Sequence, residues 1–351
     1  METLKTKSSG AMNIKKIFCL APLGLALLAP AVSVQADVSI KDNIEWFGSL
    51  RLRAEDLKYS DSGDADRARI RLRFGAKVKI DDTLSIKYRL RSNADNNNSS
   101  HDTLGADSSV DFGYDQAYAT YTGIENLTLQ AGKMPDNYFR TSELYLEDTQ
   151  IPEGVSATYK MENIKINAGH YFIEESKNGS DKDLSWDHLQ LVYGGNNYTL
   201  GLGHIALSDD TSTNFGDFEA SEITTLTAKV NMGKMFFNMD ANLSNQDADS
   251  SYKSQGQALI TRLGYNLSEK IRSSVIYYRK GQYSTLANGE FTETDMLTRE
   301  NLQAIMLQAN YKISPKVSVT PRYFYSETLD SSVSGTDESQ YRYQITMDIK
   351  F

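Results

Sequence analysis

The sequence has little cysteine, proline or histidine, and only one long apolar run. It contains one Cys, six Pro and four His among 351 residues. The cysteine, Cys19, lies inside the N-terminal apolar run, so the rest of the chain offers no disulfide, thiolate nucleophile or cysteine metal ligand. The histidines lack metal-ligand spacing, and no dinucleotide, phosphate-loop or nucleophile-elbow motif occurs. We therefore expect no enzyme activity, no cofactor and no metal site.

The apolar run near the N-terminus has the order of a secretory signal. Lys15 and Lys16 precede the apolar segment 17–32, and Ala36 ends the stretch with a small residue. We predict that residues 1–36 are an N-terminal extension plus a signal peptide, cleaved after Ala36. Residues 37–351 then form a single domain.

The charge balance is acidic. The chain has 37 basic and 46 acidic side chains, and residues 1–36 contain four of the former and one of the latter. The predicted mature chain thus keeps 33 basic and 45 acidic side chains, a formal net charge of −12. A chain this acidic is a poor ligand for nucleic acid, because binding to nucleic acid depends on neutralising phosphates. We expect no nucleic-acid partner.

Apolar and charged residues alternate with a period of two. Between Arg67 and Ile80, even positions are apolar and most odd positions are Arg or Lys, and the runs after Leu84 and after Tyr341 repeat this pattern. Such a period indicates strands with one apolar and one polar face. Adjacent like charges on one face are costly in a dry core, so the charged face must be in water.

Sixteen segments are predicted to be strands. They are 44–57, 66–80, 84–93, 113–122, 126–133, 154–161, 164–174, 184–194, 197–207, 223–231, 235–244, 255–267, 270–281, 300–312, 316–326 and 341–351. Short turns alternate with long polar loops, and an even number of strands joined in this way is typical of a transmembrane β-barrel. The sequence predicts an all-β, 16-stranded antiparallel barrel in the outer membrane of a Gram-negative bacterium, with 14 or 18 strands as alternatives.

The final outward position is Phe351, and bacterial barrels characteristically end in such an aromatic residue.

Basic residues gather on the polar faces of the first three strands. We predict that Arg51, Arg53, Arg69, Arg71, Arg73, Arg89 and Arg91 line the pore. The loop 134–153 carries acids that we expect to oppose them, namely Glu143, Glu147, Asp148 and Glu153. A basic wall facing an acidic loop would screen solutes by size and charge. The alternative is that the arginines pair with inward acids on neighbouring strands and brace the wall.

The segment around this loop carries family-specific residues. The run Gln130-Ala131-Gly132-Lys133-Met134-Pro135, the later Ile151-Pro152-Glu153-Gly154-Val155 and the preceding Asp115-Gln116-Ala117-Tyr118 resemble the Gram-negative outer-membrane porins of the Putative porin family. The resemblance implies a homotrimeric, water-filled diffusion channel whose third loop folds inward. The chain departs from the family at Tyr145-Leu146, where such loops often carry an aromatic residue directly before the acidic pair.

The sequence thus predicts an outer-membrane porin for passive diffusion of ions and small hydrophilic solutes. Its expected partners are outer-membrane lipid, lipopolysaccharide and two further copies of the chain. The first alternative is a substrate-selective channel for an anionic or sugar-like solute. Two alternatives come from other functional classes. One is a closed barrel that does not conduct, and the other is a barrel enzyme whose catalytic residues are distant in sequence and come together only in the folded chain.

Overall fold

The polar and apolar alternation produces long strands in the computed structural model of the chain. The structure describes residues 43–351 apart from 61–62, 94–98, 106–110, 146–150, 175–183, 210–221, 245–252, 287–299 and 336. The predicted signal peptide, residues 1–36, lies outside the described residues. Residues 43–351 belong to one compact unit, and the following description concerns that unit.

The described residues contain sixteen long strands and one strand of two residues. The long strands are β1 (Ile44–Tyr59), β2 (Ala65–Lys79), β3 (Leu84–Ser92), β5 (Phe112–Ile124), β6 (Leu127–Lys133), β7 (Glu153–Met161), β8 (Ile164–Glu174), β9 (Leu184–Gly194), β10 (Tyr198–Asp209), β11 (Glu222–Met232), β12 (Met235–Ser244), β13 (Gln257–Asn266), β14 (Ile271–Lys280), β15 (Leu302–Ser314), β16 (Val317–Thr328) and β17 (Ser339–Lys350). The short strand is β4 (Asp102–Thr103), and two short helical turns are η2 (Lys253–Gly256) and α3 (Ser331–Ser334). No helix in the described ranges is long and apolar enough to cross a membrane.

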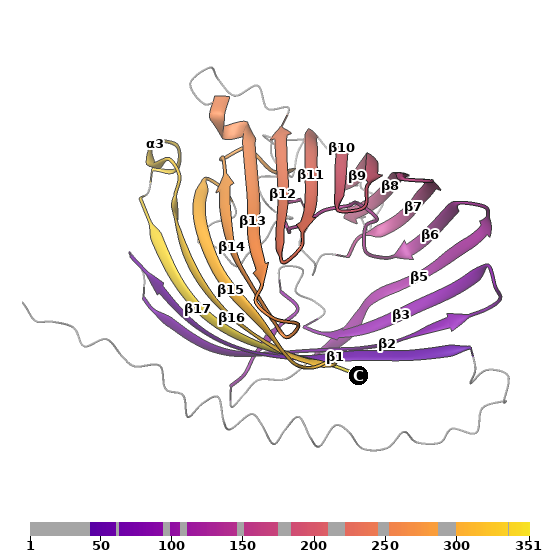
Figure 1. Ribbon diagram of the computed structural model, residues 1–351, viewed down its shortest axis with the longest axis horizontal. Helices are drawn as coiled ribbons and strands as arrows, with labels where there is room; N and C mark the ends of the chain where they lie inside the picture. Colours follow the sequence, from indigo (N-terminus) through magenta and orange to yellow (C-terminus); the bar gives the residue numbers. More distant parts are fainter. Residues whose placement is uncertain are drawn as a thin grey trace, which may run out of the picture. The chain divides into compact units, whose positions relative to one another are not determined.

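The sheet closes on itself. Each long strand pairs antiparallel with the next long strand, and β1 pairs with both β2 and β17. The β1–β17 ladder runs from Ser49 opposite Lys350 to Tyr59 opposite Gln340. Closure leaves no strand edge exposed, which a chain needs where water cannot satisfy its backbone. The predicted 16-stranded antiparallel barrel is confirmed, and Figure 1 shows β1 to β3 across the ring from β9 to β12.

The two ends of the barrel differ in how strands are joined. At one end, which we call the short-turn end, connections such as Glu162-Asn163 and Gly233-Lys234 are two residues long. Glu162 and Gly233 adopt left-handed backbone conformations there, with φ of 48° and 63°. The opposite end, which we call the long-loop end, carries the loop between β3 and β5 and the loop between β6 and β7.

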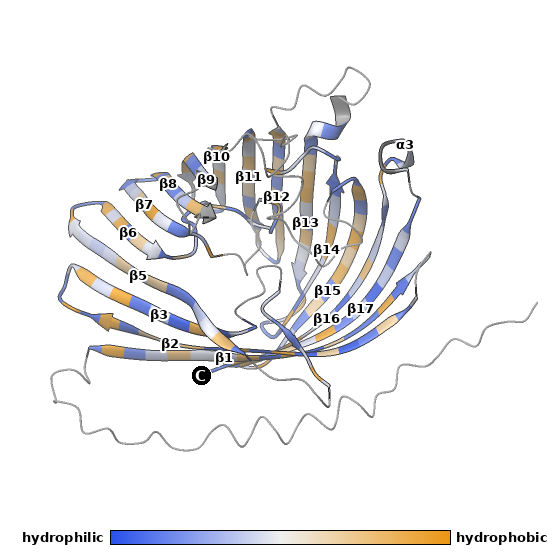
Figure 2. Ribbon diagram, turned by 180° about the vertical axis from the view of Figure 1, so that it is seen from behind, coloured by the Kyte–Doolittle hydropathy of each residue, from blue (hydrophilic) through white to orange (hydrophobic). Residues whose placement is uncertain are grey.

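The outer face of the barrel is apolar. Large side chains such as Trp46, Leu189 and Leu202 point outward and are 62%, 60% and 58% exposed. Figure 2 shows the resulting alternation of hydrophobic and hydrophilic residues along the strands. Exposure of so much apolar surface is expected of a barrel whose outer face contacts lipid.

The inner face has two kinds of wall. On β9 to β16, the inward positions toward the long-loop end form an apolar cluster that includes Trp186, Ile205, Ile276 and Phe324. Two loops contribute to this cluster through residues such as Leu144 and Leu286. On β17, β1, β2 and β3, most inward positions are instead polar, and many of them are charged. Loop residues therefore fill the lumen along its apolar wall, and the charged side chains are concentrated on the opposite wall.

Candidate pore constriction

The seven predicted arginines share one inner wall. Strand register places Arg51 opposite Arg71 and Arg53 opposite Arg69 on β1 and β2. It also places Arg73 of β2 opposite Arg91 of β3, two residues after Arg89. Arg67 and Arg342 extend the same wall, and we call these nine side chains the arginine wall. Residues directly opposite on one face lie about 5 Å apart at Cβ, so the guanidinium groups crowd together.

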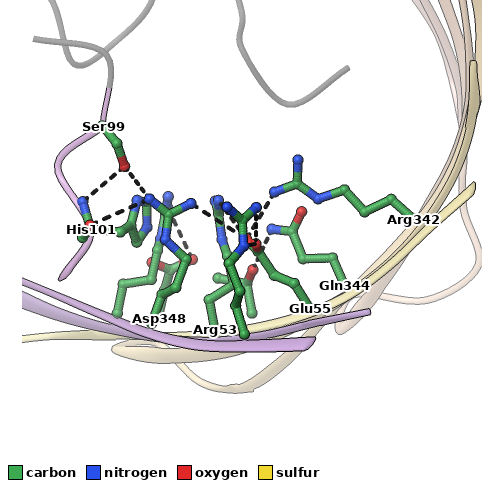
Figure 3. Close-up of polar contacts among 11 residues, drawn as sticks. Arg53, Glu55, Ser99, His101, Arg342, Gln344 and Asp348 are labelled. Carbon is green, nitrogen blue, oxygen red and sulfur yellow. Dashed lines mark hydrogen bonds and ion pairs between the residues drawn. The ribbon is translucent and has the colours of Figure 1, made fainter. Parts of the chain in front are cut away.

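A buried carboxylate lies at the centre of the arginine wall. Glu55, whose side chain is fully buried, pairs with Arg67 and Arg342 at 2.8 Å, with Arg53 at 3.3 Å and with Arg69 at 3.8 Å. Figure 3 shows Arg53 and Arg342 converging on it from β1 and β17. A buried carboxylate shared by several guanidinium groups offsets part of their mutual repulsion.

Two further acids hold the flanks of the wall. Asp348 on β17 accepts from Arg51 through both oxygens, with the shorter contact at 2.6 Å. Asp115 on β5 accepts from Arg89 at 2.7 and 2.8 Å and lies 3.9 Å from Arg73. Among the described residues, the ion pairs of the arginine wall go to these two acids and Glu55. The structure thus contains the bracing pairs that the sequence left as an alternative.

Arg71 differs from its neighbours. It is 7% exposed, and no carboxylate in the described ranges pairs with it. Its Nε atom is buried without a hydrogen-bond partner. Arg71 therefore contributes a positive charge that the described side chains do not compensate through a direct contact.

The loop between β3 and β5 folds back onto this wall. Its strand β4 pairs with β2, with Thr103 opposite Arg69. The Arg69 guanidinium donates to the Ser99 hydroxyl and to the His101 carbonyl oxygen, the latter at 3.3 Å. Burial, followed by the nearby arginines, lowers the pKa of His101 far below its ordinary value. His101 is therefore neutral and adds no charge to the wall.

The loop after β6 is attached to the opposite wall. Its two ends meet where the Met134 N–H donates to the Pro152 carbonyl at 3.0 Å. From there the described residues 134–145 run along β7 to β12. The Asp240 carboxylate of β12, fully buried, accepts from the Thr141 N–H at 2.9 Å, from its hydroxyl at 2.8 Å and from Ser142 at 2.6 Å. Four donors in total converge on this carboxylate, because Thr227 also donates to it at 2.8 Å.

A glycine lets this loop approach the wall closely. Gly203 points inward on β10, where a Cβ atom would lie 2.0 Å from the Tyr138 hydroxyl oxygen. Tyr138 shares a short hydrogen bond with Thr225 of β11. On the neighbouring strand, Gln190 accepts from the Phe139 N–H at 2.7 Å and donates to its carbonyl at 2.9 Å. A side chain at position 203 would push the loop into the lumen.

Of the four predicted acids of this loop, the structure describes Glu143 and Glu153 and does not bring these two together. Glu143 is half-buried, and its neighbours in the chain, Ser142 and Tyr145, both donate hydrogen bonds to β12. Glu147 and Asp148 lie outside the described residues. Glu153 differs from the prediction, because β7 begins at this residue and its side chain shares the outward face of Val155. It pairs there with Lys133 at 3.2 Å rather than facing the lumen.

Several residues that shape this region were missed by the sequence analysis. Glu55, Asp115 and Asp348 hold the arginines, and Asp240 holds the loop. A signal existed for Glu55 and Asp348, since both lie in phase with the polar face of their strands. For Asp240 the period showed only that it faces inward, and nothing indicated its loop partners, which are about a hundred residues away in sequence.

The geometry is a closed barrel with a loop folded inside and a basic wall facing it. Among solved structures, a triple mutant of Rhodopseudomonas blastica porin matches with a TM-score of 0.56 and 10% identity, covering 88% of this chain and 100% of that chain. The chain has a porin barrel. Another variant of that porin gives a TM-score of 0.55 at 9% identity with the same coverage. A loop-deleted OmpT, an outer membrane protein of Vibrio cholerae, gives 0.54 at 12% identity and covers 88% of this chain and 99% of that chain.

The sequence comparison agrees with the porin fold. Residues 52–175 match the family described as Putative porin, and this segment includes β2, β3 and the loop after β6. The resemblance to porins is confirmed. The comparison with curated proteins gives no match.

Proposed function

We propose that this porin forms a channel in the bacterial outer membrane for passive diffusion of ions and small hydrophilic solutes. The observation that carries the proposal is a closed barrel with a basic wall on β17 to β3 and a loop attached across the ring on β7 to β12. Inward charges of this kind act on solutes in the lumen at short range. The proposal involves no catalytic step and no cofactor.

The channel prefers anions under this proposal. Arg71 supplies a positive charge that no carboxylate among the described residues contacts, next to Arg51 and Arg73, and neutral His101 does not alter it. The predicted loop acids would oppose the arginines from the other side. Charges on the wall lie within a Debye length of about 8 Å of a passing ion at physiological salt, so they outweigh acids farther away at the mouth.

The test is single-channel recording of the refolded protein in a planar bilayer under a salt gradient. We expect the wild type to conduct, with a reversal potential whose sign indicates anion selectivity. In an Arg71→Glu and Arg73→Glu double variant, we expect the reversal potential to shift toward cation selectivity. Arg272→Glu is the matched control, since Arg272 lies on β14 outside the arginine wall and packs on the Phe236 ring. Absence of conductance would contradict the channel, and equal shifts in both variants would contradict the role of the wall.

A second candidate is a substrate-selective channel for an anionic or sugar-like solute. The buried Arg71, which no carboxylate in the described ranges contacts, favours it, because such a group can bind an anionic oxygen strongly. Saturating block of chloride current by inorganic phosphate would favour this candidate. Current that falls linearly with solute size, with no saturation, would favour the general channel.

The remaining parts of the proposal concern maturation and assembly. We propose cleavage after Ala36 and a homotrimer set in lipid and lipopolysaccharide. Mass spectrometry of the mature N-terminus tests the first. Single-channel recording tests the homotrimer, which should open in three steps of equal conductance.

A further inference from the structure

The lumen carries a second group of basic side chains at the short-turn end of the barrel. On β2, Lys77 lies four residues after Arg73 and therefore points to the same inner face. The register of neighbouring strands carries this face around the barrel and gives eight inward lysines on seven strands. We call them the lysine ring, namely Lys77, Lys79, Lys87, Lys160, Lys165, Lys229, Lys312 and Lys350.

The lysine ring has little opposing charge. At the last two inward positions of each long strand before the short turns, the described residues include two acids, Glu45 and Asp348. Asp348 already accepts from Arg51. None of the eight lysines forms an ion pair with a described carboxylate. Six of the eight side chains are exposed, and Lys77 and Lys87 are half-buried, so the ring presents free ammonium groups to the lumen.

Two pairs of these lysines lie directly opposite each other. Lys77 faces Lys87 across β2 and β3, and Lys160 faces Lys165 across β7 and β8. Like charges directly opposite on one face of a sheet are destabilising. Because the side chains point into the lumen, they do not extend toward lipid as outward lysines at a membrane surface do. Neither strand pairing nor membrane anchoring therefore accounts for the ring.

The connections at the two ends of the barrel differ in charge. In the sequence, the eight connections at the long-loop end contain 25 Asp or Glu and five Lys or Arg. The seven connections at the short-turn end contain five acids and three lysines, which leaves the positive excess of the ring in place. Lys77 lies about 9 Å beyond Arg73 along the barrel axis, because a strand rises about 3.3 Å per residue and tilts about 45°. Positive charge thus extends from the arginine wall to the short-turn mouth of the lumen.

We propose that the lysine ring binds solutes with several negative charges, such as polyphosphates and polycarboxylates, when they enter the lumen from the short-turn side. The inference rests on the proposed channel and adds to it a binding site, a class of solute and a direction. In outer-membrane barrels the short turns face the periplasm, so the ring would act on solutes that arrive from there.

The number of charges on the solute decides how strongly the ring acts on it. A cleft lined by one sign of charge within low-dielectric walls concentrates ions of the opposite sign. A potential of one kT raises the local concentration of a monovalent anion about threefold and that of a tetravalent anion about fiftyfold, since the effect grows exponentially with charge. Separate ammonium groups around a wide lumen therefore select for the charge of a solute rather than for one molecular shape.

The test is block of chloride current by tripolyphosphate, added to one chamber of a planar bilayer at a time. In a Cys19→Ser background, Ser332→Cys marks the long-loop end, since Ser332 is exposed in α3. Labelling of this thiol by a membrane-impermeant maleimide, in vesicles into which the protein inserts from one side, shows which end remains on that side. At about 0.1 M salt, we expect the half-blocking concentration to be at least tenfold lower from the short-turn side than from the long-loop side. This ratio should fall toward one at about 1 M salt, where the Debye length is only about 3 Å.

Two variants that remove positive charge at the same end provide the comparison. The ring variant changes the two opposed pairs, namely Lys77→Gln, Lys87→Gln, Lys160→Gln and Lys165→Gln. The matched control changes the three lysines of the short turns, namely Lys234→Gln, Lys270→Gln and Lys316→Gln. Both variants keep the arginine wall, and their folding is checked by heat-dependent mobility on SDS gels. We expect the ring variant to lose the difference between the two sides and the control to keep it.

The outcomes separate this inference from the channel. A wild type that conducts and is blocked equally from both sides would overturn the inference and leave the channel intact. Equal loss of the difference in the ring variant and the control would assign the effect to the turns and also overturn it. A barrel that carries no current contradicts the channel, and the ring is then tested by calorimetric titration of the detergent-folded barrel with tripolyphosphate. The ring variant should bind at least tenfold more weakly than the wild type, and equal affinities would overturn the inference.

Discussion

At the scale of single residues, the arginine wall depends on a few buried carboxylates. Arg67 and Arg342 both reach Glu55 at 2.8 Å, although they come from different strands. Each such charge would be costly to bury alone, because the low dielectric strengthens repulsion between guanidinium groups. Glu55 therefore contributes to stability as well as to the field in the lumen.

We predict that Glu55→Gln destabilises the barrel by about 3–5 kcal/mol, because it removes the compensating charge from several buried arginines at once. Asp348→Asn, which affects the single partner Arg51, is expected to cost roughly 1–2 kcal/mol. Urea titration of the folded barrel, followed by fluorescence of Trp46 and Trp186, measures both. Equal losses in the two variants would refute the central role of Glu55.

Gly203 gives a second prediction at this scale. A methyl group at this position would overlap the Tyr138 hydroxyl, so Gly203→Ala should lose about 1–3 kcal/mol of stability through overpacking. Gly201→Ala is the comparison, since its Cβ would be 3.0 Å from the flexible Phe139 ring. The same urea titration applies, and an unchanged midpoint for Gly203→Ala would show that the loop does not press on β10.

At the scale of elements, the loop after β6 is held by polar anchors on five strands, namely β7, β8, β9, β11 and β12. Tyr145 donates to the Ala241 carbonyl at 2.9 Å, one residue beyond Asp240. Leu144 and Tyr145 are also almost fully buried in the apolar cluster. Apolar burial keeps the loop on this wall, and the hydrogen bonds fix its register along it.

Asp240→Ala should loosen this loop, since it leaves the Thr141 N–H and the hydroxyl groups of Thr141, Ser142 and Thr227 without their acceptor. Losing hydrogen bonds to a charged group costs about 1.5–3 kcal/mol, which corresponds to roughly 10- to 100-fold faster amide exchange at Thr141. Hydrogen exchange with mass spectrometry measures it.

Asn242→Ala provides the control for this experiment. Asn242 also points inward on β12, but it donates to Ser284 of a different loop. Residues 138–145 should keep their wild-type exchange in this variant. Comparable acceleration by both variants would mean that β12 as a whole, rather than the Asp240 anchor, holds the loop.

At the scale of the whole molecule, closure is the condition for a stable barrel. β17 joins β16 to β1, and the C-terminal Phe351 N–H donates to the Gly48 carbonyl at 3.1 Å. Without this strand, β1 and β16 would each present an unpaired edge.

Deleting residues 339–351 should therefore abolish the folded barrel, while deleting 331–334, which form α3 and pair with no strand, should preserve it. Folding is read from the heat-dependent mobility of the barrel on SDS gels. A heat-modifiable product from the first deletion would contradict the requirement for closure.

The sequence and the structure agree best where a local period decides the outcome. The strands β8, β9 and β12 begin and end where the alternation predicts. Agreement fails at Glu153, because a strand that begins one residue earlier turns a predicted loop acid into an outward side chain on the strand. Asp240 lay beyond prediction, since the period shows that it faces inward but says nothing of the loop that it binds.

The sequence by itself determined that the chain forms a barrel and that the seven predicted arginines share one face, because odd and even positions of a strand point to opposite faces. It favoured 16 strands but left 14 or 18 open, and the structure settled the count. Tertiary structure decided which inner wall is apolar, where the loops settle and which acids meet the arginines. Glu55 and Arg342 are 287 residues apart in the chain, and only closure of the ring brings them together.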